Sequence, residues 1–318
     1  MFRLILLAAL AAPLFAHAQA YPSKAVRIIN PFAPGGATDI IARHMAQKLT
    51  EAWGQPVVVE NRAGASGALG VEHVAKSAAD GYTLLIATQT THAANPALYA
   101  KLPYDAAKDF APLTLAGSTP LALLVHPTLP VRDVRELLEH VKKNPGKLAY
   151  ASGGNGTSQH LTMELLKTMT GSYMVHIPYK GAGPAMTDFL GGQVNLMFDN
   201  LPTALPHVKS GKLKALAVTT LERNSALPDV PTIHETVLPN FQSITWHSVL
   251  VPAGTPKPIV QRLNSELVKI VNSPDVKDRF TQQGLTAVGS SPEELRALIK
   301  TESAEYAKVV KEIGLQPQ

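Results

Sequence analysis

Short apolar runs alternate with longer amphipathic segments in the first hundred residues of the chain. The runs are aliphatic, often β-branched and flanked by turn residues, which predicts buried strands at Val26–Ile29, Val57–Val59 and Leu84–Ala87. Between the first two lies Thr38–Glu51, where apolar residues recur every fourth position and predict a helix with one apolar face: Ile41, Met45 and Leu49. This order predicts an α/β fold with a parallel sheet that helices cover.

The same alternation continues through the rest of the chain. Further strands are predicted at Leu148–Ala151, His176–Ile177, Val194–Phe198 and Leu213–Val218. Further helices are predicted to begin near Asp133, before the stripe Leu161, Leu165 and Met169, and at Gly183-Pro184, Thr255-Pro256, Ser273-Pro274 and Ser291. Asp133-x-x-Glu136 and Ser291-x-x-Glu294 both resemble capping boxes, in which two side chains satisfy free backbone N–H groups at a helix start.

Two extended segments with flanking prolines are the candidates for crossings between lobes: Ala116–His126 and Phe241–Val251. A chain of 318 residues is long enough for two lobes. A chain that leaves one lobe, builds a second and returns needs two such crossings. We therefore predict lobe 1 from residues 19–121 with 245–318, and lobe 2 from residues 122–244.

Small residues are frequent in the loops that connect the predicted strands to the helices that follow them. Pro34-Gly35-Gly36 separates the first strand from the first helix, and glycine lets a ligand approach the backbone without meeting a Cβ. The first N–H groups of a helix have no partner within it and attract anions. Similar corners follow four later strands: Gly64–Gly67, Thr88–His92, Ser152–Ser158 and Tyr179–Gly183. The alternative is that each is only a tight turn, but corners in both halves favour a clamp that closes on a small anion.

The N-terminus predicts export. Met1–Arg3 carries a positive charge, Leu4–Phe15 is almost wholly apolar, and cleavage is expected after Ala18 or Ala20. Residues 1–18 therefore read as a signal peptide, too short for a membrane anchor. The chain has no cysteine, which excludes disulfides and thiol catalysis, and its net charge of +5 is dispersed rather than clustered. Dispersed charge is not typical of a nucleic-acid-binding protein.

Catalytic spacing is missing from the sequence. Neither Ser66 nor Ser152 stands in the G-x-S-x-G turn of hydrolases, and no phosphate-binding loop or paired histidine motif occurs. We therefore predict no enzyme, no cofactor and no metal site. Asp199 ends a strand and is a candidate polar residue of the cleft, with a turn residue as the alternative reading. His92 and His160 lie near the suspected loops.

Several stretches together resemble the substrate-binding proteins of tripartite tricarboxylate transporters, the Bug or TctC-like receptors. The resemblance follows the whole chain after the signal in order, through Tyr21-Pro22, Val26–Asp39, Glu60–Gly67, Thr91–Pro96, Tyr150–Ser152, Pro178–Gly181 and Gly191–Asp199. It implies a two-lobed type II periplasmic-binding-protein fold with the ligand cleft between the lobes. It also implies that backbone groups of two loops, helped by waters, hold a ligand carboxylate.

The resemblance assigns site residues by motif. Those of the first loop are Phe32, Ala33, Gly36, Ala37 and Asp39, and those of the middle loop are Ser152, Thr157 and Ser158. Gln89 and Thr90 stand where members of the family vary, so they are expected to influence which ligand binds.

The sequence thus predicts a monomeric periplasmic receptor. It would capture a small organic carboxylate, such as a di- or tricarboxylate, an acidic amino acid or an aromatic acid, and deliver it to a two-subunit membrane permease. Two alternatives stay open: a sensor that passes the ligand to a signalling partner, and an exported serine hydrolase.

Overall fold

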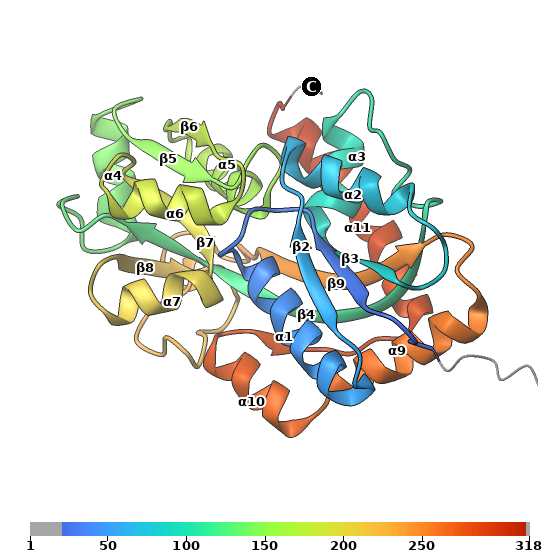
Figure 1. Ribbon diagram of the computed structural model, residues 1–318. Coiled ribbons are helices and arrows are strands. Elements are labelled where there is room, and N and C mark those ends of the chain that lie inside the picture. Colours follow the sequence, from blue (N-terminus) through green and yellow to red (C-terminus); the bar gives the residue numbers. More distant parts are fainter. Residues whose placement is uncertain (1–20, 316–318) are drawn as a thin grey trace, which may run out of the picture.

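The computed structural model describes residues 21–315, so the predicted signal peptide lies outside the described residues. Ten strands form one extended sheet with two groups of strands at its ends (Figure 1). The path through the sheet runs β2-β1-β3-β9-β4-β7-β5-β6, and β8 and β10 both pair with β4. None of the helices within residues 21–315 is long and apolar enough to span a bilayer.

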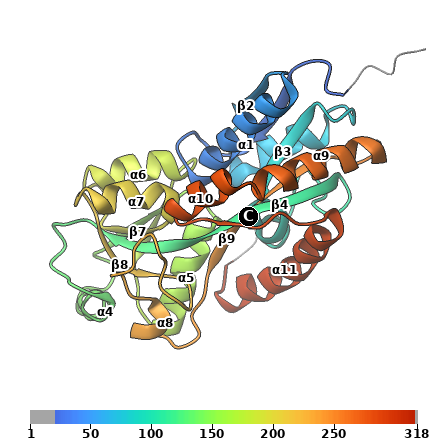
Figure 2. The ribbon, with the colours of Figure 1, turned by 90° about the horizontal axis from the view of Figure 1, so that it is seen from below.

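The first group contains parallel strands and the helices packed on them. Its N-terminal elements are β1 (Val26–Asn30), α1 (Ala37–Trp53), β2 (Val57–Asn61), α2 (Ala68–Ala75), β3 (Thr83–Thr88), a π-helical turn (Thr90–Ala94) and α3 (Asn95–Leu98). The chain returns to this group with α9 (Lys257–Val271), α10 (Pro274–Gln282), β10 (Thr286–Ala287) and α11 (Pro292–Glu312). Figure 2 shows α9 and α10 on one side of β4 and α11 on another.

The second group is built from the middle of the chain. Its elements are α4 (Val134–Lys143), β5 (Ala149–Ser152), α5 (Ser158–Thr170), β6 (Val175–Pro178), α6 (Ala182–Leu190), β7 (Leu196–Asn200), α7 (Leu201–Lys209), β8 (Lys214–Val218) and α8 (Ile233–Thr236). Strand β5 pairs in parallel with β6 and with β7.

Two strands connect the groups, and both were predicted as crossings. Strand β4 (Phe110–Val125) pairs with β9 (Ile244–Pro252) through residue 120, and from Leu121 onward it pairs with β7 and β8. The exact division into lobes nevertheless stays a prediction.

Alternate residues of the strands enter different cores, because helices cover both faces of each group. In β1, Ile28 packs with the helices α1, α9 and α10, whereas Ile29 packs with α2 and α11. In β7, Phe198 and Met197 divide in the same way between the two faces of the second group. Each group therefore has its own hydrophobic core.

Helix α1 follows its predicted pattern closely. Ile41, Met45 and Leu49 are all buried, and Gly54 ends the helix in the left-handed conformation with φ of 65°. In α5 the predicted stripe is confirmed at Leu161, which is buried, and at Leu165, which packs partly buried against the core, but it is wrong at Met169, which is exposed. Met163 and Leu166 are also buried.

Candidate functional site

A small cavity of about 40 Å³ lies between the two groups of strands. From the first group it is lined by Phe32, Gly36, Ala37, Thr38, Thr88 and Thr90. From the second group it is lined by Gly153, Thr157, Ser158, Gln159, Gly181, Ala182 and Asn200, and Thr245 of β9 completes the wall. A buried water needs roughly 10–15 Å³, so the cavity has room for a few waters or a compact ligand.

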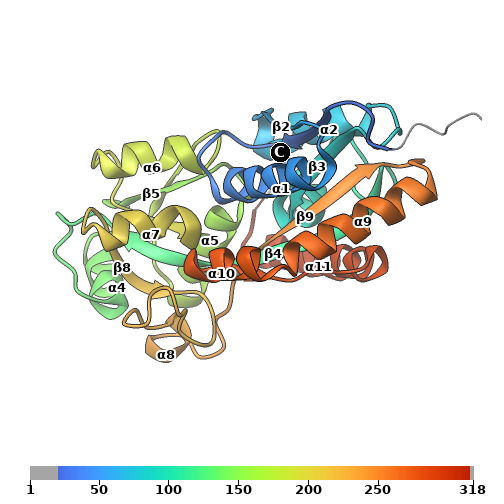
Figure 3. The ribbon, with the colours of Figure 1, turned by 60° about the horizontal axis from the view of Figure 1, so that its bottom comes forward.

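Four helices begin at this cavity, and Figure 3 shows α1 directed toward α6 and α7. Their N-caps are Gly36 for α1, Thr157 for α5, Gly181 for α6 and Asn200 for α7. None of the four forms a side-chain cap, although threonine and asparagine commonly do. Apart from Pro184 of α6 and Pro202 of α7, which have no N–H group, their first N–H groups are therefore available to a ligand.

Among the helices that begin elsewhere, α8 and α11 show a contrast, whereas α9 and α10 also lack a side-chain cap. Thr232 and Ser291 form complete capping boxes at the starts of α8 and α11. None of the described residues that line the cavity carries a charge. At the surface of the cavity, the positive ends of helix dipoles and the free amides are the groups that favour an anion.

The first loop, residues 31–36, is held from behind by a polar network around Asp39. The Asp39 carboxylate accepts hydrogen bonds from Gly35 N at 3.2 Å, Asn61 Nδ2 at 2.9 Å and Arg43 Nε at 2.9 Å. Burial alone would raise the pKa of Asp39, but these donors outweigh it and lower the pKa below its usual value. Asp39 therefore stays ionised and fixes Gly35, whose φ of 86° requires glycine.

The middle loop, residues 153–157, is held in a similar way by Ser152. Its Oγ lies 3.1 Å from Gly154 N and 2.6 Å from His176 Nε2. Thr157 Oγ1 donates to Gly154 O at 2.7 Å, and Gly156 N donates to His160 Nδ1 at 3.0 Å. These bonds shape the loop so that the N–H groups of α5 face the cavity.

The contact between Ser152 and His176 resembles part of a hydrolase site but lacks its other features. Ser152 is fully buried and does not line the cavity. His176 lies between Tyr150 and His160, with ring centroids 4.8 and 4.0 Å away, and no carboxylate within residues 21–315 orients it. A nucleophile needs access to substrate and an oriented base, so this pair supports the loop.

The predicted site residues divide into two layers. Six of them line the cavity: Phe32, Gly36, Ala37, Thr90, Thr157 and Ser158. The other five lie behind it or beside it: Ala33, Asp39, Gln89, Ser152 and Asp199. The predicted site residues did not include eight lining residues, of which Thr88, Gly153, Gly181 and Ala182 lie in the predicted corners; the eight are Thr38, Thr88, Gly153, Gln159, Gly181, Ala182, Asn200 and Thr245. Thr38, Thr88, Gly153, Gln159 and Asn200 adjoin predicted residues, and Gly181 and Ala182 lie in the predicted corner Tyr179–Gly183, so only Thr245 had no local signal.

Several side chains at the cavity are buried without hydrogen-bond partners. They are Thr88 Oγ1, Asn200 Oδ1 and Thr245 Oγ1. Gln89, which lies between Thr88 and Thr90 in the sequence, also has a buried atom without a partner, Nε2. Gln89 uses its other atom, Oε1, to accept from Trp246 N at 3.2 Å. Buried polar atoms without partners cost stability, so these groups are suited to bind polar parts of a ligand.

The two groups touch around the cavity through glycines of the second group. A Cβ at Gly181 would lie 2.9 Å from Ala33 Cβ, and one at Gly183 would lie 2.4 Å from Pro34 O. Gly154 and Gly156 similarly face Ser66 and Leu98. The structure is therefore a closed form in which the backbones of the two groups approach closely.

Asp199 is a buried acid behind the cavity, and its raised pKa makes the stability of the protein depend on pH. Burial raises the pKa of Asp199 to about 6, although hydrogen bonds from Thr203 and Gln159 act in the opposite direction. Between about pH 4 and 6 the unfolded chain has released this proton and the folded chain has kept it, so the free energy of unfolding falls as the pH rises. Above about pH 6 the decrease in the free energy of unfolding is complete, and it amounts to about 3 kcal/mol for a pKa difference of about two units.

We expect Asp199→Asn to remove this pH dependence. Urea unfolding of both proteins from pH 4 to 7.5 should show the variant gaining stability relative to the wild type as the pH rises. Other titrating groups are shared and cancel in the comparison. Parallel curves across this range would contradict a buried acid at this position.

Residues 41–315 match the model of the tripartite tricarboxylate transporter family receptor, TctC. The chain belongs to this family. The receptor is 37% identical to the periplasmic binding protein BugD, with a TM-score of 0.90, covering 94% of this chain and 100% of BugD.

Two further solved structures hold bound ligands. Rpa4515 of R. palustris, solved with adipate, is 37% identical with a TM-score of 0.92, covering 94% of this chain and 100% of that one. MatC of Rhodopseudomonas palustris, solved with bound malate, is 35% identical with a TM-score of 0.87, covering 91% and 100%. The receptor therefore has the two-lobed type II periplasmic-binding-protein fold and is a solute-binding protein, not an enzyme.

Proposed function

We propose that the receptor captures a small organic carboxylate in the periplasm. The single observation that carries the proposal is the uncharged cavity on which four uncapped helix starts converge. The proposal assigns the carboxylate to the amides of Ala37 and Thr38 on one side and of Ser158 and Gln159 on the other.

Magnitudes explain why both lobes are required. A helix dipole contributes about 0.3–1 kcal/mol near the surface, and a hydrogen bond to a charged group contributes about 1.5–3 kcal/mol. Micromolar affinity requires about 8 kcal/mol in excess of the association cost. Several amides from two lobes reach this sum, whereas one helix start does not.

The relatives support an aliphatic dicarboxylate as the first ligand class to test, because Rpa4515 was solved with adipate and MatC with bound malate. The unpartnered hydroxyls of Thr88 and Thr245 can donate to the second carboxylate of such a ligand, and Asn200 Oδ1 can accept from a ligand hydroxyl. Gln89 and Thr90 would then influence specificity, as the sequence predicted.

Transport is the proposed purpose of binding. The predicted signal peptide would send the chain to the periplasm, where lobe 1 (residues 19–121 with 245–318) and lobe 2 (residues 122–244) close on the ligand. The closed monomer would deliver the carboxylate to a two-subunit membrane permease. Reconstitution of uptake with the permease components would test this step separately from binding.

A paired ligand screen tests the binding step. We expect at least one carboxylate among adipate, malate, citrate, glutamate and benzoate to raise the melting temperature by about 5 °C near a hundred times its Kd. The primary amide of the same acid should give no shift at that concentration. A screen in which no carboxylate stabilises the protein, or in which acid and amide act alike, would contradict the proposal.

A further inference from the structure

A second concave surface lies on the far side of the turn that lines the cavity. We define the groove as the 940 Å³ hollow between the segment 96–107, which follows the π-helical turn, and one face of α11. Figure 1 shows α3 and α11 close together, and they are in contact. The turn Thr90–Ala94 thus has Thr90 at the cavity and His92 at the groove.

His92 is the unusual group at the floor of the groove. It is fully buried, and its Nε2 has no hydrogen-bond partner. Thr91 Oγ1 accepts from Thr88 N and is placed 3.1 Å from Thr88 O, to which it can donate, and this arrangement favours the tautomer in which His92 Nδ1 is the donor across its 3.0 Å contact with the same oxygen. In this tautomer Nε2 keeps a lone pair, and none of the described residues donates to it.

The walls of the groove are aromatic and aliphatic. Tyr99, Leu102, Pro103 and Tyr104 form one side, and Ile299 contributes to the other. Tyr104 is fixed because its hydroxyl donates to Thr91 O at 2.6 Å. Such walls suit a flat apolar ring.

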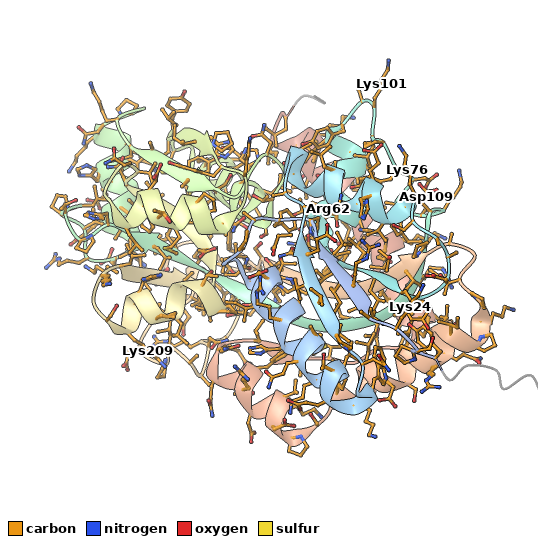
Figure 4. All side chains as sticks on the ribbon, in the orientation of Figure 1. Lys24, Arg62, Lys76, Lys101, Asp109 and Lys209 are labelled. Atoms are coloured by element: carbon orange, nitrogen blue, oxygen red, sulfur yellow. The ribbon has the colours of Figure 1, made fainter. Side chains whose placement is uncertain are left out.

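The rim of the groove is positively charged. Arg296 and Lys300 lie one helical turn apart on α11 and are both exposed, and within residues 21–315 neither forms an ion pair. The acidic lining residue, Asp105, is engaged by Lys108 at 3.1 Å. Lys101, at the tip of the segment, points to solvent (Figure 4).

We propose that the groove is a second binding site, distinct from the cavity, for an aromatic acid that carries a hydroxyl group. The ring packs between Tyr99 and Ile299, the carboxylate pairs with Arg296 and Lys300, and the hydroxyl donates to His92 Nε2. Burial also lowers the pKa of His92 to about 3, which keeps the ring neutral and Nε2 able to accept.

Titration with 4-hydroxybenzoate tests this site, with benzoate and 4-hydroxybenzamide as probes that each lack one group. We expect millimolar or tighter binding of 4-hydroxybenzoate and roughly tenfold weaker binding of each of the other two. Absence of binding at about 10 mM would overturn the site. Equal binding of benzoate would overturn the role of His92.

Matched variants locate the probe. Arg296→Ala with Lys300→Ala should weaken 4-hydroxybenzoate at least about tenfold, whereas Lys308→Ala with Lys311→Ala, which removes the same charge from α11 outside the groove, should not. Gly183→Ala, which obstructs closure of the cavity, should leave this binding unchanged. If Gly183→Ala abolishes binding and the Arg296 and Lys300 pair does not, the probe occupies the cavity and the inference fails. That result would leave the proposed carboxylate function intact.

Discussion

Gly183→Ala is expected to weaken carboxylate binding at least about a hundredfold without unfolding the receptor. The new Cβ would lie 2.4 Å from Pro34 O, a backbone atom that cannot move away without distorting the first loop. The lobes would then stop short of full closure and lose at least two hydrogen bonds to the carboxylate, each worth about 1.5–3 kcal/mol. Because Gly183 lies in the first turn of α6, alanine should preserve or slightly raise the melting temperature without ligand.

Gly191→Ala is the matched control. Gly191 ends the same helix, and a Cβ there would lie 3.5 Å from Asp188 O, an ordinary contact. Calorimetry should give unchanged affinity for this variant. Equal affinities for Gly183→Ala and the wild type would show that closure at Pro34 does not contribute to binding.

Ala37→Pro is expected to weaken binding by about ten- to a hundredfold through loss of one backbone donor. Ala37 is the first residue of α1, where proline is tolerated because this N–H has no partner within the helix. Gly36 already has φ of −85° and ψ of 168°, which suits a residue before proline. The variant should therefore fold normally and lose only the interaction with the carboxylate.

Ala37→Val distinguishes the effect of losing the N–H group from the effect of a larger side chain on ligand affinity. Valine enlarges the side chain but keeps the N–H group, so calorimetry should find most of the affinity retained. If valine and proline weaken binding equally, steric exclusion is responsible, and the amide of Ala37 has no part in holding the ligand.

Local sequence patterns account for the regular elements. The stripe Ile41, Met45 and Leu49 predicts α1 because its core lies along a single face. The Ser291–Glu294 capping box is complete. At the start of α4, Asp133 caps Glu136 N, but the Glu136 carboxylate accepts from Arg132 N instead of Asp133 N.

Tertiary contacts explain what the patterns missed. The π-helical turn Thr90–Ala94 was predicted only as a loop, because distant groups hold it: Tyr104 donates to Thr91 O and Ser303 donates to His92 O. In α5 the regular spacing of Leu161, Leu165 and Met169 suggested one face, but the buried residues spread more widely: Met163 and Leu166 pack in the second group with Leu165, and Leu161 packs with Val310 of α11.

The part of the candidate site at the glycine-rich corners was predictable from the sequence. The part that β9 contributes was not. Gly36 and Thr157 stand at strand-to-helix corners, so their place at the cavity follows from parallel topology. Thr245 reaches the cavity because β9 pairs with β3 and β4, more than a hundred residues earlier in the chain. Which side chains remain without partners, such as Asn200, depends on the packed structure alone.

A crystal structure of the receptor with the carboxylate found in the screen tests the central claim most directly. We predict both carboxylate oxygens within about 3.2 Å of backbone N–H groups from the starts of both α1 and α5, in a closed cleft without a basic side chain. A carboxylate held by lysine or arginine, or bound by only one lobe, would contradict it.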